Sequence, residues 1–267
     1  MLKFALISIS FLSITNIVSA KKTKHTSMYF SWGYNRDIYS PSNVHFVNLE
    51  KYDFTVHQLK ATDRPSFSWN DLKQNVNYII EPTIPQYQYR IGYFLNKQKT
   101  KSIEINFDHT KYVSVDNQIA RVSGTINGVA IDREMILRPD SFLHFEHTNG
   151  ANFMMINYAQ QFALLSKYKF AKNKLKLVAK AGVGIVIPKT DVTLFGKRLD
   201  NKFHIAGYVT GIETGLRYFF TKKFYVEYTG KIAFANYVNA LTMEGGRANH
   251  SFFAFERLGS IGYCFNF

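Results

Sequence analysis

Residues 224–235, FYVEYTGKIAFA, alternate between two kinds of side chain. Every second residue from Phe224 to Phe234 is aromatic or aliphatic, apart from Gly230, and the residues between them include a glutamate, a threonine and a lysine. Successive side chains of a strand point to opposite faces, so this segment predicts a strand that separates two environments, one apolar and one polar.

The same alternation recurs along the chain and predicts an antiparallel transmembrane up-and-down β-barrel, an all-β fold. Most of these segments exceed the usual strand length of about five or six residues and match the about 9–11 residues that cross a bilayer at a tilt. The connections alternate between short and long, as they do in such barrels, which places the long ones outside the cell and both termini in the periplasm. We expect eight strands near 27–35, 86–96, 101–111, 151–166, 174–187, 204–219, 223–236 and 251–267.

The long connections contain alternating stretches of their own, at 112–128 and 190–199. These stretches either extend the barrel strands above the membrane or form additional hairpins. A ten-stranded barrel is therefore the alternative to eight strands.

Composition excludes several other classes of protein. Of the 267 residues 46% are hydrophobic and only 19% are charged, which argues against disorder driven by charge. Beyond the N-terminal segment no apolar run reaches the length of a membrane-spanning helix. The single cysteine, Cys264, excludes an intramolecular disulfide and a multi-cysteine metal site.

Residues 1–20, MLKFALISISFLSITNIVSA, have the pattern of a secretory signal peptide. Lys3 supplies the positive start, an apolar stretch follows, and Val18-Ser19-Ala20 resembles the small-x-small cleavage pattern. We therefore expect an exported protein whose mature barrel domain comprises residues 21–267.

The inner face of the predicted barrel carries paired charges. A turn at 221–223 would place Arg217 opposite Glu227 and Glu213 opposite Lys231, close enough for ion pairs. These charges either line a gated solute path or form a salt-bridged plug, and the plug is favoured because buried charges persist mainly when paired. The predicted inward residues are the acids Glu104, Asp108, Glu213, Glu227 and Glu256 and the bases Arg90, Lys176, Lys180, Arg217 and Lys231.

The C-terminal sequence LGSIGYCFNF resembles the terminal strand by which Gram-negative outer-membrane barrels are recognised for insertion. Tyr263, Phe265 and Phe267 would form this insertion signal, and the resemblance implies the barrel-assembly machinery as a partner. With its eight-strand layout the mature chain is similar to the small OmpA-, OmpX- and OmpW-type barrels. The segments FSWGYNRDIY (30–39), TDRP (62–65) and HFEHTNGANF (144–153) further resemble outer-membrane barrel proteins of the Bacteroidota, a likeness that carries no activity to transfer.

Some small outer-membrane barrels are hydrolases, and two short stretches of this chain contain candidate catalytic residues. His144, Glu146 and His147 lie in HFEH, where the first two share a strand face and the set is incomplete as a metal site. His250-Ser251 is similar to the paired residues of lipid A deacylases, but the Ser-Asn-Ala context is missing. Neither stretch supports assigning catalytic residues, a metal or a cofactor.

The formal charge of +14 suggests nucleic-acid binding, but an exported barrel does not meet nucleic acid. Outer-membrane lipids and the phosphates of lipopolysaccharide are the expected partners for the surplus lysines and arginines. The sequence thus predicts a non-enzymatic outer-membrane scaffold or surface-interaction protein, whose extracellular ligand it does not specify. The alternatives are a lipid A-modifying or other hydrolase at the rim, and a small-solute channel.

Overall fold

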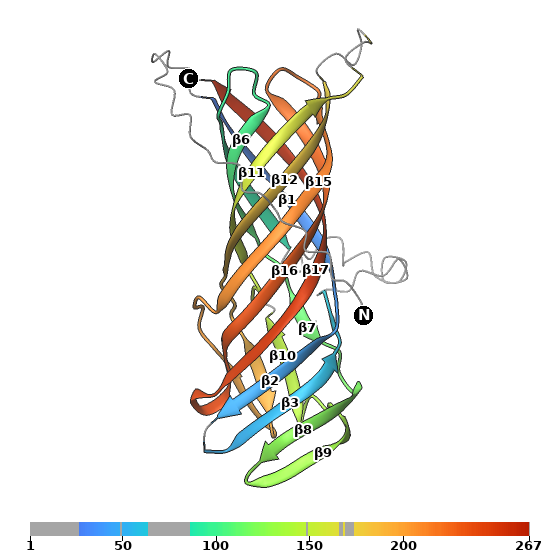
Figure 1. The fold of residues 1–267 in the computed structure, drawn as a ribbon, viewed down its shortest axis with the longest axis vertical. Coiled ribbons are helices and arrows are strands. Elements are labelled where there is room, and N and C mark those ends of the chain that lie inside the picture. Colours follow the sequence, from blue (N-terminus) through green and yellow to red (C-terminus); the bar gives the residue numbers. More distant parts are fainter. Residues whose placement is uncertain are drawn as a thin grey trace, which may run out of the picture.

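The computed structural model describes residues 27–48, 50–63, 86–147, 149–165, 168 and 174–266. Eight strands pair in a closed ring, each antiparallel to its neighbours and tilted against the long axis (Figure 1). They follow one another around the ring in chain order, and the first pairs with the last. The barrel strands are β1 (Ser27–Tyr39), β5 (Tyr87–Phe94), β6 (Lys101–Asp108), β11 (Phe153–Ala163), β12 (Leu175–Val186), β15 (Gly207–Phe219), β16 (Phe224–Leu241) and β17 (Arg247–Asn266).

The eight-stranded antiparallel barrel predicted from the alternation is therefore confirmed. The sequence underestimated the length of the first strand and of the last hairpin, because β1 continues to Tyr39, β16 to Leu241, and β17 already begins at Arg247. A bulge between Tyr237 and Ala240 interrupts the register where the last hairpin rises above the ring.

At the end of the barrel opposite the short turns, the long connections fold into two further sheets, which we call the cap. In one of them β17 continues beyond the ring and pairs with β2 (Ser42–Asn48), followed by β3 (Tyr52–Leu59), β8 (Ile119–Ile126) and β9 (Val129–Ile136). The other contains β14 (Lys197–Asp200), β13 (Asp191–Leu194), β10 (Leu143–His147), β7 (Tyr112–Ser114) and β4 (Ala61–Thr62). A 3₁₀ turn, η1 (Met243–Gly245), joins β16 to β17.

The alternating stretches at 112–128 and 190–199 thus form cap strands rather than a ninth and tenth barrel strand, so the ten-stranded alternative is wrong. The described residues contain no helix that is long and apolar enough to cross a membrane.

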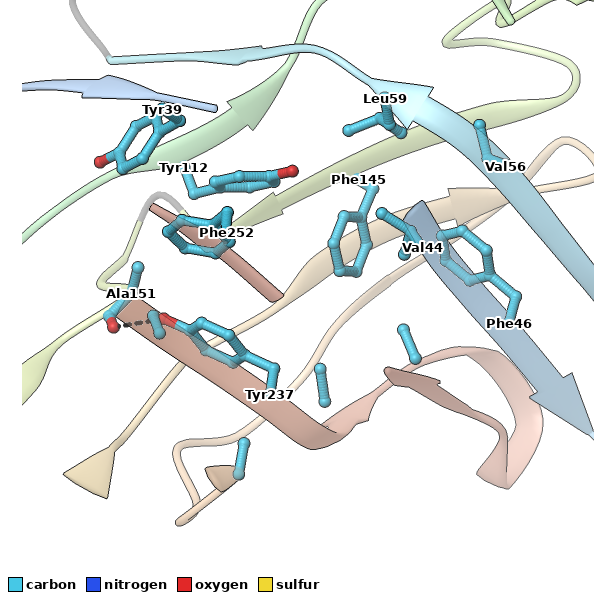
Figure 2. Packing of buried hydrophobic residues seen from close by; sticks show 14 of the residues in the cluster. Tyr39, Val44, Phe46, Val56, Leu59, Tyr112, Phe145, Ala151, Tyr237 and Phe252 are labelled. Atoms are coloured by element: carbon cyan, nitrogen blue, oxygen red, sulfur yellow. Dashed lines mark hydrogen bonds between the residues drawn. The ribbon is translucent and has the colours of Figure 1, made fainter. Parts of the chain in front are cut away.

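The two cap sheets pack against each other through an aromatic core, shown in Figure 2. Phe46 of one sheet meets Phe145 of the other edge to face, with 5.3 Å between ring centroids. Tyr112 also stacks on Phe252, an inward residue of β17, with 4.6 Å between ring centroids. Burial of such rings stabilises the fold by the hydrophobic effect, and their edge-to-face and stacked contacts add to this stabilisation. The cap therefore closes that end of the barrel with a packed core.

The outer face of the barrel exposes apolar side chains on every strand. An ordinary soluble protein rarely exposes a contiguous apolar surface of this extent. Among the described residues one example from each barrel strand, in ring order, is Trp32, Ile91, Ile105, Ile156, Val183, Ile212, Ile232 and Phe255.

Candidate functional site

Nine of the ten charged residues predicted on the inner face meet inside the barrel, and we call them the ion cluster. Each is at most 5% exposed. Strand alternation points them inward, and barrel closure brings residues from β5, β6, β12, β15, β16 and β17 together. The members are Arg90, Glu104, Asp108, Lys180, Glu213, Arg217, Glu227, Lys231 and Glu256.

Arg90 contacts carboxylates on both sides of the lumen. Its guanidinium donates to Asp108 on the neighbouring strand β6, and its Nη2 lies 3.4 Å from Oε2 of Glu213 on β15. Strands β5 and β15 are four steps apart in either direction around the ring of eight. This ion pair therefore spans the lumen.

Lys180 is surrounded by three carboxylates. Its Nζ lies 3.2 Å from Glu104, 3.0 Å from Glu213 and 2.9 Å from Glu227. An ammonium with no acceptors in water-free surroundings would be strongly destabilised, and these oxygens replace the lost hydration.

Lys231 forms the second pair across the lumen. Its Nζ lies 2.6 Å from Oδ2 of Asp108, four strands away around the ring, and 2.9 Å from Oε1 of Glu256 on the adjacent strand. Lys231 lies opposite Glu213 in the β15–β16 register, as the turn predicted. The expected ion pair between them does not form, however, because Glu213 turns to Lys180 and Arg90.

Arg217 lies opposite Glu227, as expected, and its Nε donates to the Glu227 carboxylate at 2.5 Å. The guanidinium also stacks between the rings of Tyr29 and Tyr225, at 4.8 and 4.2 Å from the centroids. Such cation–π contacts stabilise a desolvated cation.

The two rings have room because glycines lie beneath them on the inner face. A Cβ at Gly92 would come within 2.0 Å of Tyr29, and one at Gly262 within 2.1 Å of Tyr225.

The tenth predicted member, Lys176, does not join the cluster, which corrects the expected balance of five acids and five bases. Lys176 is only partly buried near the short turns, and its Nζ lies 4.9 Å from the ring centroid of Phe219. The cluster itself therefore contains five acids and four bases.

Several polar residues around the ion cluster were not among the predicted site residues. Tyr29 donates to Glu104 at 2.7 Å, Asn157 donates to Asn106 at 2.7 Å, and Thr229 donates to Glu213 at 2.8 Å. All of them occupy inward positions, so the same alternation that identified the charges would have identified these residues too.

The cap contains a buried histidine pair. The Nε2 atoms of His147 and His250 are 3.3 Å apart, so one ring donates to the other, and Thr190 lies 3.0 Å from Nδ1 of His147. Burial and the neighbouring His250 lower the pKa of His147 well below its ordinary value. This arrangement favours neutral rings and a structural role in the aromatic core.

The catalytic candidate His250-Ser251 is not assembled. His250 points into the aromatic core and Ser251 is exposed on the opposite face of β17. Adjacent residues of a strand point apart, so the two side chains do not meet.

His144 and Glu146 do come together, on a groove of about 640 Å³ in the cap. His144 Nε2 lies 3.0 Å from Oε2 of Glu146, and its Nδ1 lies 2.7 Å from Oδ1 of Asp116. The hydrogen bond to Glu146 raises the pKa of His144, partial burial opposes this, and Asp116 adds to it. An imidazole held between two carboxylates favours the protonated form, which suits electrostatic binding better than proton abstraction.

Two of the three proposed insertion residues are described. Tyr263 and Phe265 lie on the last strand 4.8 Å apart between ring centroids, and Tyr263 also packs against Phe224. Phe267 lies outside the described residues, as does the predicted signal peptide at 1–20. Within the described ranges no group of three or more His, Cys, Asp or Glu residues is arranged to hold a metal ion.

Comparisons with known proteins give structural similarity only. No protein-family model matches the chain, and no curated protein matches it. Among solved structures it is similar to Neisserial surface protein A, with 8% identity, a TM-score of 0.39, and coverage of 89% of this chain and 96% of that chain. It is also similar to Ail, the attachment invasion locus protein of Yersinia pestis, with 9% identity, a TM-score of 0.36, and coverage of 91% and 100%.

A third similar structure is the outer membrane protease OmpT from Escherichia coli, with 8% identity, a TM-score of 0.42, and coverage of 90% and 97%. At these identities and TM-scores no activity is transferred from any of the three.

Proposed function

We propose that this chain is an integral outer-membrane barrel with a closed lumen and a folded extracellular cap that serves as an interaction surface. The observation that carries the proposal is the contrast between the two faces of the closed ring. Its outside exposes apolar residues on every strand, whereas its inside carries paired ions. A closed ring leaves no strand edge unpaired, as a bilayer requires.

The difference between the two ends of the barrel supports one orientation in the membrane. The short turns lie at one end and the cap at the other (Figure 1). Barrels of this class direct short turns to the periplasm. The cap accordingly lies outside the cell, after export by the signal peptide at 1–20.

The ion cluster supports a closed lumen rather than a channel. Two ion pairs, Arg90–Glu213 and Lys231–Asp108, connect walls that are four strands apart. An eight-stranded barrel is just wide enough for its side chains to fill. A conducting path would require these pairs to separate in a low-dielectric interior. Breaking a buried ion pair there costs about 3–5 kcal/mol.

Two measurements test this proposal. The chain should fractionate with the outer membrane, with Lys21 as its first residue, and the purified barrel should produce no discrete conductance steps in a planar bilayer. Reproducible steps in the native chain would contradict the closed lumen and favour the small-solute channel.

The cap's partners follow from its position and charge. Outer-membrane lipids and lipopolysaccharide phosphates are the surfaces that its exposed cations meet. Insertion would depend on the barrel-assembly machinery acting on Tyr263, Phe265 and Phe267, and no nucleic-acid partner is proposed.

A rim hydrolase is the second candidate, and one observation favours it: Ser114 and Thr193 line the same groove as Asp116, His144 and Glu146. Mass spectrometry of lipid A from cells that overproduce the native chain or its His144→Ala variant decides between the two. A change in lipid A that requires His144 would establish the hydrolase, whereas identical lipid A would leave the interaction role.

A further inference from the structure

The short-turn end of the barrel contains a cavity of about 900 Å³, which we call the turn-side mouth. It opens between the turn after β5, the turn after β15 and the start of β12. The ion cluster lies further inside the barrel, and none of its members is among the described residues that line the mouth.

The mouth is strongly basic. No Asp or Glu is found among its described lining residues. The sequences of the three short turns, 95–100, 164–174 and 220–223, likewise contain no acid. The lysines that line the mouth are Lys97, Lys99, Lys174, Lys176 and Lys222.

Two of the cations in this region oppose each other directly. Lys176 on β12 is in register with Arg217 on β15, and both side chains are on the inner face. Like charges opposite each other on neighbouring strands are destabilising. Glu227 pairs with Arg217, whereas Lys176 has no carboxylate partner within the described residues. A bound anion would relieve this repulsion.

Gln161 gives an independent indication of a ligand. Gln161 is 3% exposed and lines the mouth, yet neither its amide nitrogen nor its amide oxygen has a hydrogen-bond partner in the described part of the chain. Leaving such a buried polar group unsatisfied typically costs about 1–3 kcal/mol. A ligand oxygen at the amide nitrogen would remove part of this cost.

We propose that the turn-side mouth is a binding site for a phosphate-bearing ligand. Cations reach the mouth from three separate segments, so a multivalent oxyanion can contact several of them where a single carboxylate would not. Phe94, Phe219 and Cys264 supply an apolar portion of the wall for the rest of the ligand. The volume is within the range of about 300–1,000 Å³ that is typical of small-ligand sites.

The phosphate can come from a soluble compound or from a phospholipid headgroup, and this site does not depend on the interaction role of the cap. Isothermal titration calorimetry on the full mature chain, folded in a neutral detergent, separates the two sources. One arm titrates sodium pyrophosphate. The other titrates dihexanoyl phosphatidylglycerol, with dihexanoyl phosphatidylcholine as the zwitterionic reference of zero net charge.

The test variant is Lys174→Met/Lys176→Met, and its matched control is Lys60→Met, an exposed lysine in the cap. We expect the double variant to raise Kd at least about tenfold, which corresponds to about 1.4 kcal/mol, and the control to leave Kd unchanged. Gln161→Leu should weaken binding as well. Because Gln161→Leu changes a buried side chain, the partly exposed lysines carry the test if that variant does not fold.

Binding of pyrophosphate that is lost in the double variant supports a soluble phosphate compound. Binding of phosphatidylglycerol alone, with the same loss, supports a lipid headgroup. No binding of either probe, or equal effects of the double variant and Lys60→Met, would overturn the proposal.

Discussion

Replacing Lys231 by methionine should destabilise the barrel, because it removes a cation from the buried ion cluster. Lys231 is 3% exposed, and its ammonium lies 2.6 Å from Asp108 and 2.9 Å from Glu256. After the substitution Asp108 keeps Arg90 as a partner. Glu256 loses the cation whose contact the structure shows, and its carboxylate stays buried.

The size of the effect follows from that stranded carboxylate. Removing one partner of a buried ion pair typically costs about 3–5 kcal/mol, because the other charge is left without compensation. We therefore expect Lys231→Met to lower the free energy of unfolding by about that amount. Adding Glu256→Gln should restore part of the loss, since the uncompensated charge is then removed.

The decisive comparison is between two double variants. Glu213 faces Lys231 in register but contacts Lys180 and Arg90 instead. Adding Glu256→Gln to Lys231→Met should give a coupling in the usual range of about 0.5–3 kcal/mol, whereas adding Glu213→Gln should give a smaller coupling, because Glu213 is connected to Lys231 only through Arg90 and Asp108.

The assay is urea unfolding of the barrel in lipid vesicles, followed by tryptophan fluorescence, for which Trp32 lies on the outer face. Ile232→Leu, one residue along and facing outward, is the control and should change little. Rescue by Glu213→Gln and not by Glu256→Gln would refute the pairing described above.

Three further predictions concern topology, insertion and the cap. In a Cys264→Ser background, a cysteine introduced at Asn127 should react with an impermeant maleimide on intact cells, whereas one introduced at Gln98 should not. The reverse labelling pattern would mean that the barrel has the opposite orientation in the membrane. Deleting Phe267 should slow assembly, so that mature chain accumulates in the periplasm or is degraded, and normal outer-membrane levels would remove the proposed insertion signal. The pKa of His144 is raised in the folded state. The stabilisation of the cap by protonated His144 is therefore fully present below the ordinary histidine pKa of about 6.5, and it is lost as the pH rises through the folded-state pKa. His144→Asn should therefore destabilise the cap more at pH 5.5 than at pH 8.5, as measured by protease resistance, and equal losses at both values would contradict a charged His144.

The sequence alone determined the barrel and the direction of its side chains. Alternation has a period of two, and a strand's backbone fixes that period locally, so the inward position of residues such as Glu104 and Lys180 required no knowledge of distant neighbours. The short turn after β15 likewise set the register that places Arg217 opposite Glu227.

The tertiary structure alone decided which charges meet. Lys231 contacts Asp108, 123 residues earlier in the chain, because closure of the ring brings β6 and β16 to opposite sides of a narrow lumen. The alternating stretch at 112–128 was compatible with a barrel strand, and packing of Tyr112 against Phe252 made it part of the cap instead. Face and register follow from local geometry, whereas contacts across the lumen depend on the closure and tilt of all eight strands together.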